Sequence, residues 1–148
     1  MYKKILVAID GSHTSSLALQ EAIKLAQEQS ARLRLVHVID EFPFITADTG
    51  VIDDTQLGEV LFKAGQNIID EAVAKVKAAG LEVETALPEN LTQRIATVIV
   101  EEAKRWSADL VVVGTHGRRG IQHLVLGSVA EGVARAATMP ILLIPSRH

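Results

Sequence analysis

Residues 114–129 read GTHGRRGIQHLVLGSV, and the fold that the sequence predicts is built around this glycine-containing stretch. The apolar run Asp109-Leu-Val-Val-Val113 precedes it, and apolar residues at helical spacing follow Ser128. Glycines therefore stand at the end of a predicted strand and again at the start of a predicted helix. The first N–H groups of a helix lack partners within it and attract anions. The stretch thus predicts a strand–loop–helix unit that cradles a phosphate group.

Short apolar runs on both sides of this stretch predict further strands. Four runs are continuously apolar or nearly so, and one alternates as a half-exposed edge strand does: 5–9, 33–39, 110–113 and 141–144, then 81–87. Between them, apolar residues recur three and four positions apart in 15–29, 57–79, 95–106 and 129–136. Strand and helix alternate four times before a final strand, which predicts one α/β domain over 1–148 with a parallel sheet covered by helices on both faces.

Helix boundaries carry recognisable signals. Three predicted helix starts have an Asp, Asn or Ser three residues ahead of Gln or Glu, in the manner of a capping box: Asp53–Gln56, Asn90–Gln93 and Ser128–Glu131. Gly80 follows the longest helical stripe and predicts its end. The irregular segment between Asp40 and Asp54 has no such pattern, and irregular segments of this length are often functional.

Composition restricts the classes of partner. The chain has 148 residues, 48% of them hydrophobic, and a net charge of -3, so no overall basic field attracts nucleic acid or anionic lipid. No cysteine is present, which removes disulfides and thiolate chemistry and fits a reducing compartment. The first apolar run has only five residues before Asp10, too few for a signal peptide or a membrane span. We expect a cytoplasmic protein.

The chemistry of the glycine stretch favours an anion. Backbone N–H groups converge on phosphate oxygens only where side chains do not intrude, and Gly114, Gly117 and Gly127 meet that need. The donors at the helix start would be the N–H groups of Gly127, Ser128 and Val129. Four basic side chains lie in the same loop, although the arginines could form a solvated rim and His116 could be an exposed loop residue: His116, Arg118, Arg119 and His123.

Ligands of doubly wound sheets bind at the carboxyl ends of the strands, where the winding direction reverses. The candidate loops are the glycine stretch and the loop after the first strand, which contains Asp10; Asp10 could also simply start a turn or cap the first helix. No Gly-Lys dipeptide of a Walker A loop and no G-x-G-x-x-G after the first strand is present. His37 lies in an apolar strand, where a core or edge role is commoner than metal binding.

Five segments together make the chain similar to the universal stress protein family, over nearly its whole length. They are 1–10 (MYKKILVAID), His37-Val-Ile-Asp40, Gly114-Thr-His-Gly117, Gly127-Ser-Val129 and Met139-Pro-Ile-Leu-Leu-Ile144. The complete pattern G-2x-G-9x-G-S/T marks the ATP-binding branch of that family. The resemblance implies a three-layer, Rossmann-like fold related to the adenine nucleotide alpha hydrolases, with five parallel strands in the order 3-2-1-4-5 and about four helices. One departure is Leu87-Pro88-Glu89, where many relatives have a glycine.

The resemblance also implies a site for ATP or for ADP or AMP. Adenine would contact the backbone of Ala8 and Val38, and Asp10 would hold the ribose or help to place Mg²⁺ near the phosphates. Gly114 and Gly117 would face the ribose and phosphates. The nucleotide-binding residues that it implies are Ala8, Ile9, Asp10, Val38, Val113, Gly114, Thr115, His116, Gly117, Gly127, Ser128 and Val129. The final strand, Ile141, Leu142, Leu143 and Ile144, would form a homodimer.

Three functions follow as hypotheses. The first is an adenine-nucleotide-binding regulator of the stress response, read by an unknown protein partner. The second is a slow Mg-dependent ATPase or nucleotide-cleaving enzyme on the same fold, for which the sequence identifies no catalytic residue. The third is an interaction module with an empty site, which the intact glycine pattern disfavours.

Overall fold

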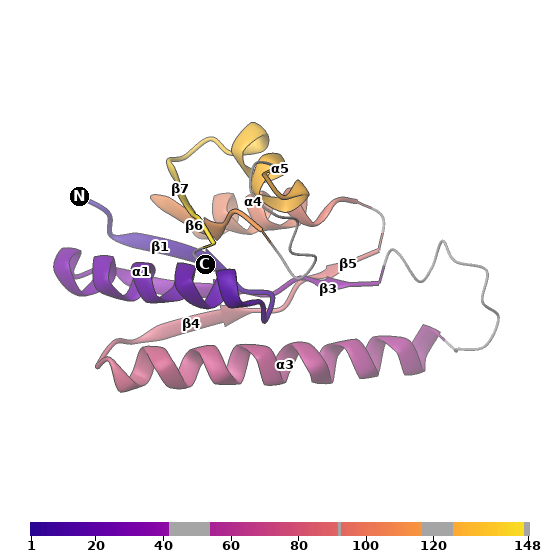
Figure 1. The fold of residues 1–148 in the computed structure, drawn as a ribbon. Coiled ribbons are helices and arrows are strands. Elements are labelled where there is room, and N and C mark those ends of the chain that lie inside the picture. The colour runs from indigo at the N-terminus through magenta and orange to yellow at the C-terminus, as the bar shows by residue number, and fades with distance from the viewer. Residues whose placement is uncertain (42–53, 92, 117–125, 147–148) are drawn as a thin grey trace.

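The protein forms a five-stranded parallel sheet between two layers of helices (Figure 1). The structure, a computed structural model, describes residues 1–41, 54–91, 93–116 and 126–146. The strands are β1 (Lys4–Ala8), β2 (Arg32–Val36), β4 (Val83–Ala86), β6 (Leu110–Gly114) and β7 (Ile141–Ile144). Their order is β4-β2-β1-β6-β7, and every pairing is parallel. The predicted order 3-2-1-4-5 is confirmed, and β4 lies at the edge as its alternating sequence indicates.

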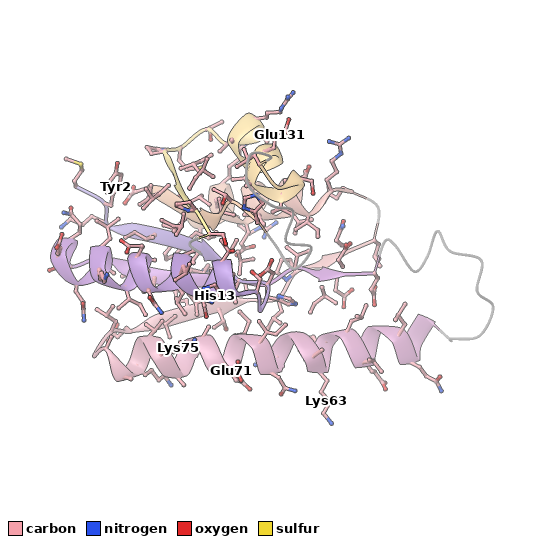
Figure 2. All side chains as sticks on the ribbon, in the orientation of Figure 1. Tyr2, His13, Lys63, Glu71, Lys75 and Glu131 are labelled. Carbon is pink, nitrogen blue, oxygen red and sulfur yellow. The ribbon has the colours of Figure 1, made fainter. Side chains whose placement is uncertain are left out.

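Two helices cover each face of the sheet. The helices are α1 (His13–Gln29), α3 (Asp54–Ala78), α4 (Ile95–Trp106) and α5 (Ser128–Ala136). Ile5 and Val7 of β1 pack in the core beneath α1 and α3, whereas Leu6 packs in the core beneath α4 and α5, because successive side chains of a strand point to opposite faces. Figure 2 shows Lys63 pointing from α3 away from the sheet, on the exposed side of that helix.

The observed helix starts differ from two of the predicted N-caps, Asn90 and Ser128. Asn90 does accept a hydrogen bond from the Gln93 N–H at 3.0 Å, but α4 begins only at Ile95, after Arg94. The Ser128–Glu131 capping box is also wrong, since Gly127 is the N-cap of α5 and no described side chain caps it. Ser128 is instead the first helical residue. Asp53 lies outside the described residues, and Gly80 stands after α3 with a φ of 81°, as predicted.

A second, two-stranded sheet was not predicted. It pairs β3 (Ile39–Asp40) with β5 (Glu89–Asn90), which the sequence indicated as a strand end and a turn. The His37 N–H donates to the Ala86 carbonyl at 3.0 Å, and the Ile39 N–H donates to the Pro88 carbonyl at 2.8 Å. Pro88 has no N–H to donate in return, which interrupts the ladder. β3 and β5 therefore continue the pairing of β2 with β4 after this break.

An ion-pair network joins β2, β4 and α4 beside Trp106. Arg34 donates to Glu84 at 3.0 Å and to Glu102 at 2.5 Å, and Arg105 also pairs with Glu102. The guanidinium carbon of Arg34 lies 5.2 Å from the centroid of the Trp106 ring, within range of a cation–π interaction. The hydrogen bond from Arg34 holds the pKa of Glu84 below its usual value. Polar side chains thus form part of the contact between the sheet and α4.

Candidate functional site

A cavity of about 770 Å³ opens at the carboxyl edge of the sheet, where β1 and β6 lie side by side. All but one of the residues predicted for the nucleotide site line it: Ala8, Ile9, Asp10, Val38, Val113, Gly114, Thr115, His116, Gly127, Ser128 and Val129. Gly117 lies outside the described residues. The two loops chosen from the sequence therefore meet at one cavity, because parallel strands end at the same edge and the winding reverses between β1 and β6.

The loop after β1 is fixed by hydrogen bonds that begin α1. Asp10 Oδ1 accepts from the Ser12 N–H at 2.8 Å, and the Asp10 N–H donates to Ser15 Oγ at 3.3 Å. Ser12 is the N-cap of α1 and accepts from the Ser15 N–H at 3.1 Å. Gly11 turns the chain with a φ of 82°. The turn-forming role of Asp10 is thus present, and Asp10 lines the cavity as well.

Gly114 allows β6 to approach the first turn of α1. A Cβ at this position would lie 2.6 Å from Thr14 Cγ2 and 3.2 Å from the Thr14 carbonyl carbon. The second of these atoms belongs to the backbone and cannot rotate away. A side chain at position 114 would therefore force β6 and the first turn of α1 to shift apart, so Gly114 has a packing role in addition to the ligand role that the sequence predicts for it.

Gly127 holds the start of α5 against the end of β6. Its N–H donates to the Thr115 carbonyl at 2.7 Å, and a Cβ on Gly127 would lie 2.8 Å from that same oxygen. Its carbonyl accepts from the Glu131 N–H at 2.9 Å. The predicted use of the Gly127 N–H as a phosphate donor needs correction, because that group is already bonded. The N–H groups with no acceptor inside the helix are those of Ser128, Val129 and Ala130.

Charge in the cavity comes from acids and histidines. Among the described lining residues the titratable side chains are Asp10, Asp40 and Glu131 with His37 and His116, and no Lys or Arg is present. His116 Nδ1 lies 3.0 Å from Thr115 Oγ1. Glu131, which Figure 2 labels, pairs with Arg135 one turn further along α5, at 2.8 Å. The positive end of the α5 dipole is thus the main described feature that favours an anion here.

Several lining residues were missed by the sequence analysis. The apolar ones are Val36, Ile95, Ile99, Leu126 and Ala130, and the polar ones are Ser15, His37, Asp40 and Glu131. Ile95 and Ile99 follow the helical period that was assigned to core packing, and that period does not distinguish a core face from a cavity wall. His37 donates from Nδ1 to the Ile9 carbonyl at 2.8 Å. This hydrogen bond agrees with the prediction that His37, in an apolar strand, has a structural role rather than a metal-binding one.

The described residues do not provide a site built for a metal. No group of three or more His, Asp or Glu side chains that could hold an ion occurs among the segments that the structure describes. Asp10 is a single carboxylate, and one of its oxygens already accepts from Ser12. A role for Asp10 toward Mg²⁺ would have to use phosphate oxygens of a ligand as further donors, and it stays a prediction. Within the same segments, no helix combines the length and apolar character needed to cross a bilayer.

Comparison with known proteins agrees with this geometry. The model of the universal stress protein family matches residues 1–145. The chain belongs to the universal stress protein family. Universal stress protein YxiE of Bacillus subtilis is 35% identical over 97% of this chain and 99% of its own length.

Solved structures of other proteins share the fold. The structure of the protein MJ0577 superposes with a TM-score of 0.86, covering 100% of this chain and 99% of that one at 25% identity. A universal stress protein in complex with cAMP superposes with a TM-score of 0.71, at 28% identity over 97% of both chains. The family resemblance inferred from the glycine pattern is thus confirmed.

Proposed function

We propose that this universal stress protein binds an adenine nucleotide (ATP, ADP or AMP) in the cavity and acts as a regulator in the stress response. The observation that carries the proposal is the meeting of the α5 N-terminus, the Asp10 loop and an apolar wall around one cavity. A relative at 28% identity has been solved in complex with cAMP, which supports a nucleotide as the ligand class.

The strand order supports an arrangement for the ligand. Phosphates would bind at the N–H groups of Ser128 and Val129, which follow β6, and the base would lie beyond β1 near Val38, which follows β2. Neighbouring strands are about 4.8 Å apart, so β2 and β6 are separated by about 10 Å. Asp10 follows the strand between them and would accept from the ribose hydroxyls. A volume of about 770 Å³ is in the usual range for small-molecule sites.

Ligand binding is tested on the purified protein. We expect AMP, ADP or ATP to raise the melting temperature, since a ligand that binds only the folded state at 100 times its dissociation constant adds about 2.7 kcal/mol of stability. For a domain of this size that corresponds to a rise of about 5–10 °C. Titration calorimetry with and without Mg²⁺, and mass spectrometry of any molecule released on denaturation, identify the nucleotide and its need for the ion. The absence of both heat and thermal shift with all three nucleotides would contradict the proposal.

We also propose that the protein forms a homodimer through β7. β7 pairs with β6 on one side only, and it forms an edge of the five-stranded sheet. Edge strands present unpaired N–H and C=O groups that pair readily with another chain. Leu142, in the middle of this strand, is 37% exposed although it is a large apolar side chain. A second copy on this edge would cover it and continue the sheet.

The dimer is tested at Leu142. Leu142→Glu is expected to shift the protein from dimer to monomer, because a buried carboxylate in a symmetric strand pair would face an apolar surface without a partner. Sedimentation velocity at several protein concentrations measures the change. Val60→Glu is the control, since Val60 is an exposed apolar residue on α3, far from this edge. A wild-type protein that sediments as a monomer throughout would rule out the dimer.

A further inference from the structure

The segment 37–41, which contains β3, forms a wall between the cavity and α3. Its side chains alternate between two faces, as those of a strand do. Val38 and Asp40 line the cavity. Ile39 and Glu41, which alternate with them, lie on the opposite face and approach glycines of α3. This wall therefore has the cavity on one side and a helix on the other.

Gly65 brings α3 into direct contact with a residue of the cavity. A Cβ at this position would lie 2.6 Å from Ile39 Cδ1 and 2.7 Å from Cδ2 of the His37 ring, so a side chain would push the wall and the helix apart. His37 lines the cavity, and its Nδ1 donates to the Ile9 carbonyl at 2.8 Å. The helix thus touches the wall at a ring that cannot turn away without breaking a hydrogen bond.

The first half of α3, residues 54–66, contributes little to the main hydrophobic core. Ile69, Ala72 and Val76 of the second half are buried in the core beneath α1 and α3. Among the described residues, none of 54–66 belongs to the core on either face of the sheet, and two of its large apolar side chains are exposed. Figure 1 shows this half extending past the end of β4. Segments with few buried apolar contacts open locally more easily than a core does.

The sheet formed by β3 and β5 is also marginal by itself. Each strand has two residues, and a two-stranded sheet needs packing against a helix or a further surface to be stable. α3 supplies this packing on one face, at Gly65, and a ligand in the cavity would supply it on the other. The wall and the first half of α3 therefore support each other, and a filled cavity would support both.

We propose that the wall, β5 and the first half of α3 form one cooperative unit, and that a ligand in the cavity suppresses the opening of this unit. α3 then carries the state of the cavity to the surface of the protein, at residues that the ligand does not touch. The proposal rests on nucleotide binding in this cavity and adds the element that responds to it. The coupling is thermodynamic, because a ligand that binds only the closed unit stabilises every contact that opens with it.

Hydrogen–deuterium exchange of the full-length protein, measured by mass spectrometry with and without AMP, tests the coupling. Without ligand, the amides of 58–66 are expected to exchange faster than those of 67–78, because the first half of α3 opens without the core. With AMP at about 100 times its dissociation constant, we expect the amides of 58–66 to exchange ~10- to 100-fold more slowly. The last turn of α1, residues 26–29, lies at the opposite edge of the sheet and is expected to be unchanged.

Two outcomes of this experiment would overturn the proposal. Equal exchange rates in the two halves of the ligand-free helix would mean that α3 opens as one element. Unchanged exchange of 58–66 in a protein that calorimetry shows to be saturated with AMP would mean that α3 does not respond to the cavity, while nucleotide binding stands. A wild-type protein that binds no adenine nucleotide would instead refute the proposed function, and this inference with it.

Gly65→Ala and Gly58→Ala form a matched pair of variants. Each adds one methyl group to α3 and favours the helix equally, and neither glycine lines the cavity. At position 58 the new Cβ would meet only the flexible end of the Glu41 side chain, at 2.8 Å. At position 65 it would displace His37 and Ile39. We expect Gly65→Ala to bind AMP at least ~10-fold more weakly and Gly58→Ala to keep the wild-type affinity.

The exchange rates of the Gly65→Ala variant show whether its lower affinity arises through α3. Its amides at 58–66 are expected to exchange faster than those of the wild type, because the contact with the wall is disturbed. Weaker binding of AMP with unchanged exchange of 58–66 would overturn the proposal. Equal affinities of the two variants, both with the wild-type circular dichroism spectrum, would overturn it as well. If Gly65→Ala does not fold, the exchange experiment on the wild-type protein decides.

Discussion

Replacing Gly127 by valine is expected to lower the affinity for adenine nucleotides at least ~100-fold while the protein stays folded. The backbone at Gly127 has φ -59° and ψ 153°, which any residue can adopt, so the substitution adds no conformational strain. The added Cβ would lie 2.8 Å from the Thr115 carbonyl oxygen and 3.4 Å from the His116 Cα. Both atoms belong to the backbone, so the start of α5 must move away from β6. The N–H groups that would bind phosphate move with it.

The measurement is titration calorimetry with AMP and ATP, beside a circular dichroism spectrum and a melting curve. Overpacking of this kind costs about 1–3 kcal/mol of stability, which a folded domain can tolerate. Gly58→Val is the matched control, because its Cβ would meet only the flexible end of the Glu41 side chain, at 2.8 Å, outside the cavity. Wild-type affinity in a folded Gly127→Val protein would show that the α5 N-terminus does not bind the phosphates.

Replacing Glu102 by leucine is expected to lower the free energy of unfolding by about 3 kcal/mol. Glu102 is 4% exposed and accepts from Arg34 at 2.5 Å, and Arg105 pairs with it as well. Removing the carboxylate leaves the guanidinium of Arg34, whose side chain is 21% exposed, with Glu84 as its remaining described acidic partner. The expected loss of stability lies at the lower end of the range for a broken buried ion pair. Glu84 and the partial exposure of Arg34 to water still stabilise the guanidinium charge.

Urea denaturation followed by the fluorescence of Trp106 and by circular dichroism measures this loss. Glu21→Leu is the control, since Glu21 pairs with Lys24 at 3.5 Å on the surface, with side-chain exposures of 45% and 69%. An exposed pair of this kind is worth about 0–1 kcal/mol. Equal losses in the two variants would mean that the network beside Trp106 contributes no more than a surface ion pair.

The sequence predicted the sheet well because the burial of a strand determines its pattern of apolar residues. Strands covered on both faces read as continuous apolar runs, and β1 and β6 are of this kind. The half-exposed edge strand β4 alternates instead, and the structure places it at the edge. The alternation of strands and helices also predicted which two loops meet, because the carboxyl ends of parallel strands share one edge and ligands bind where the winding reverses. These features depend on residue types at fixed spacing along the chain.

Capping was predicted less well, because several arrangements satisfy the same donors. The spacing Ser128–Glu131 fits a capping box, yet the N–H of Gly127 bonds to Thr115 on a different element and Gly127, not Ser128, is the N-cap. Asn90 likewise accepts from Gln93 as a cap would, but it belongs to β5 and orients Asp40. Which of these contacts forms depends on a partner that is distant in the sequence.

The sequence by itself determined the order of strands and helices, the edge position of β4, the family, and eleven of the twenty residues that line the cavity. The tertiary structure alone decided that β3 and β5 form a second sheet, that the N–H of Gly127 is already bonded, and that Ile95 and Ile99 form a cavity wall. The physical reason is the same in each case. A periodic pattern specifies which face of a helix or strand is buried. The partner of that face, or of a backbone N–H group such as that of Gly127, is fixed only when distant segments pack together.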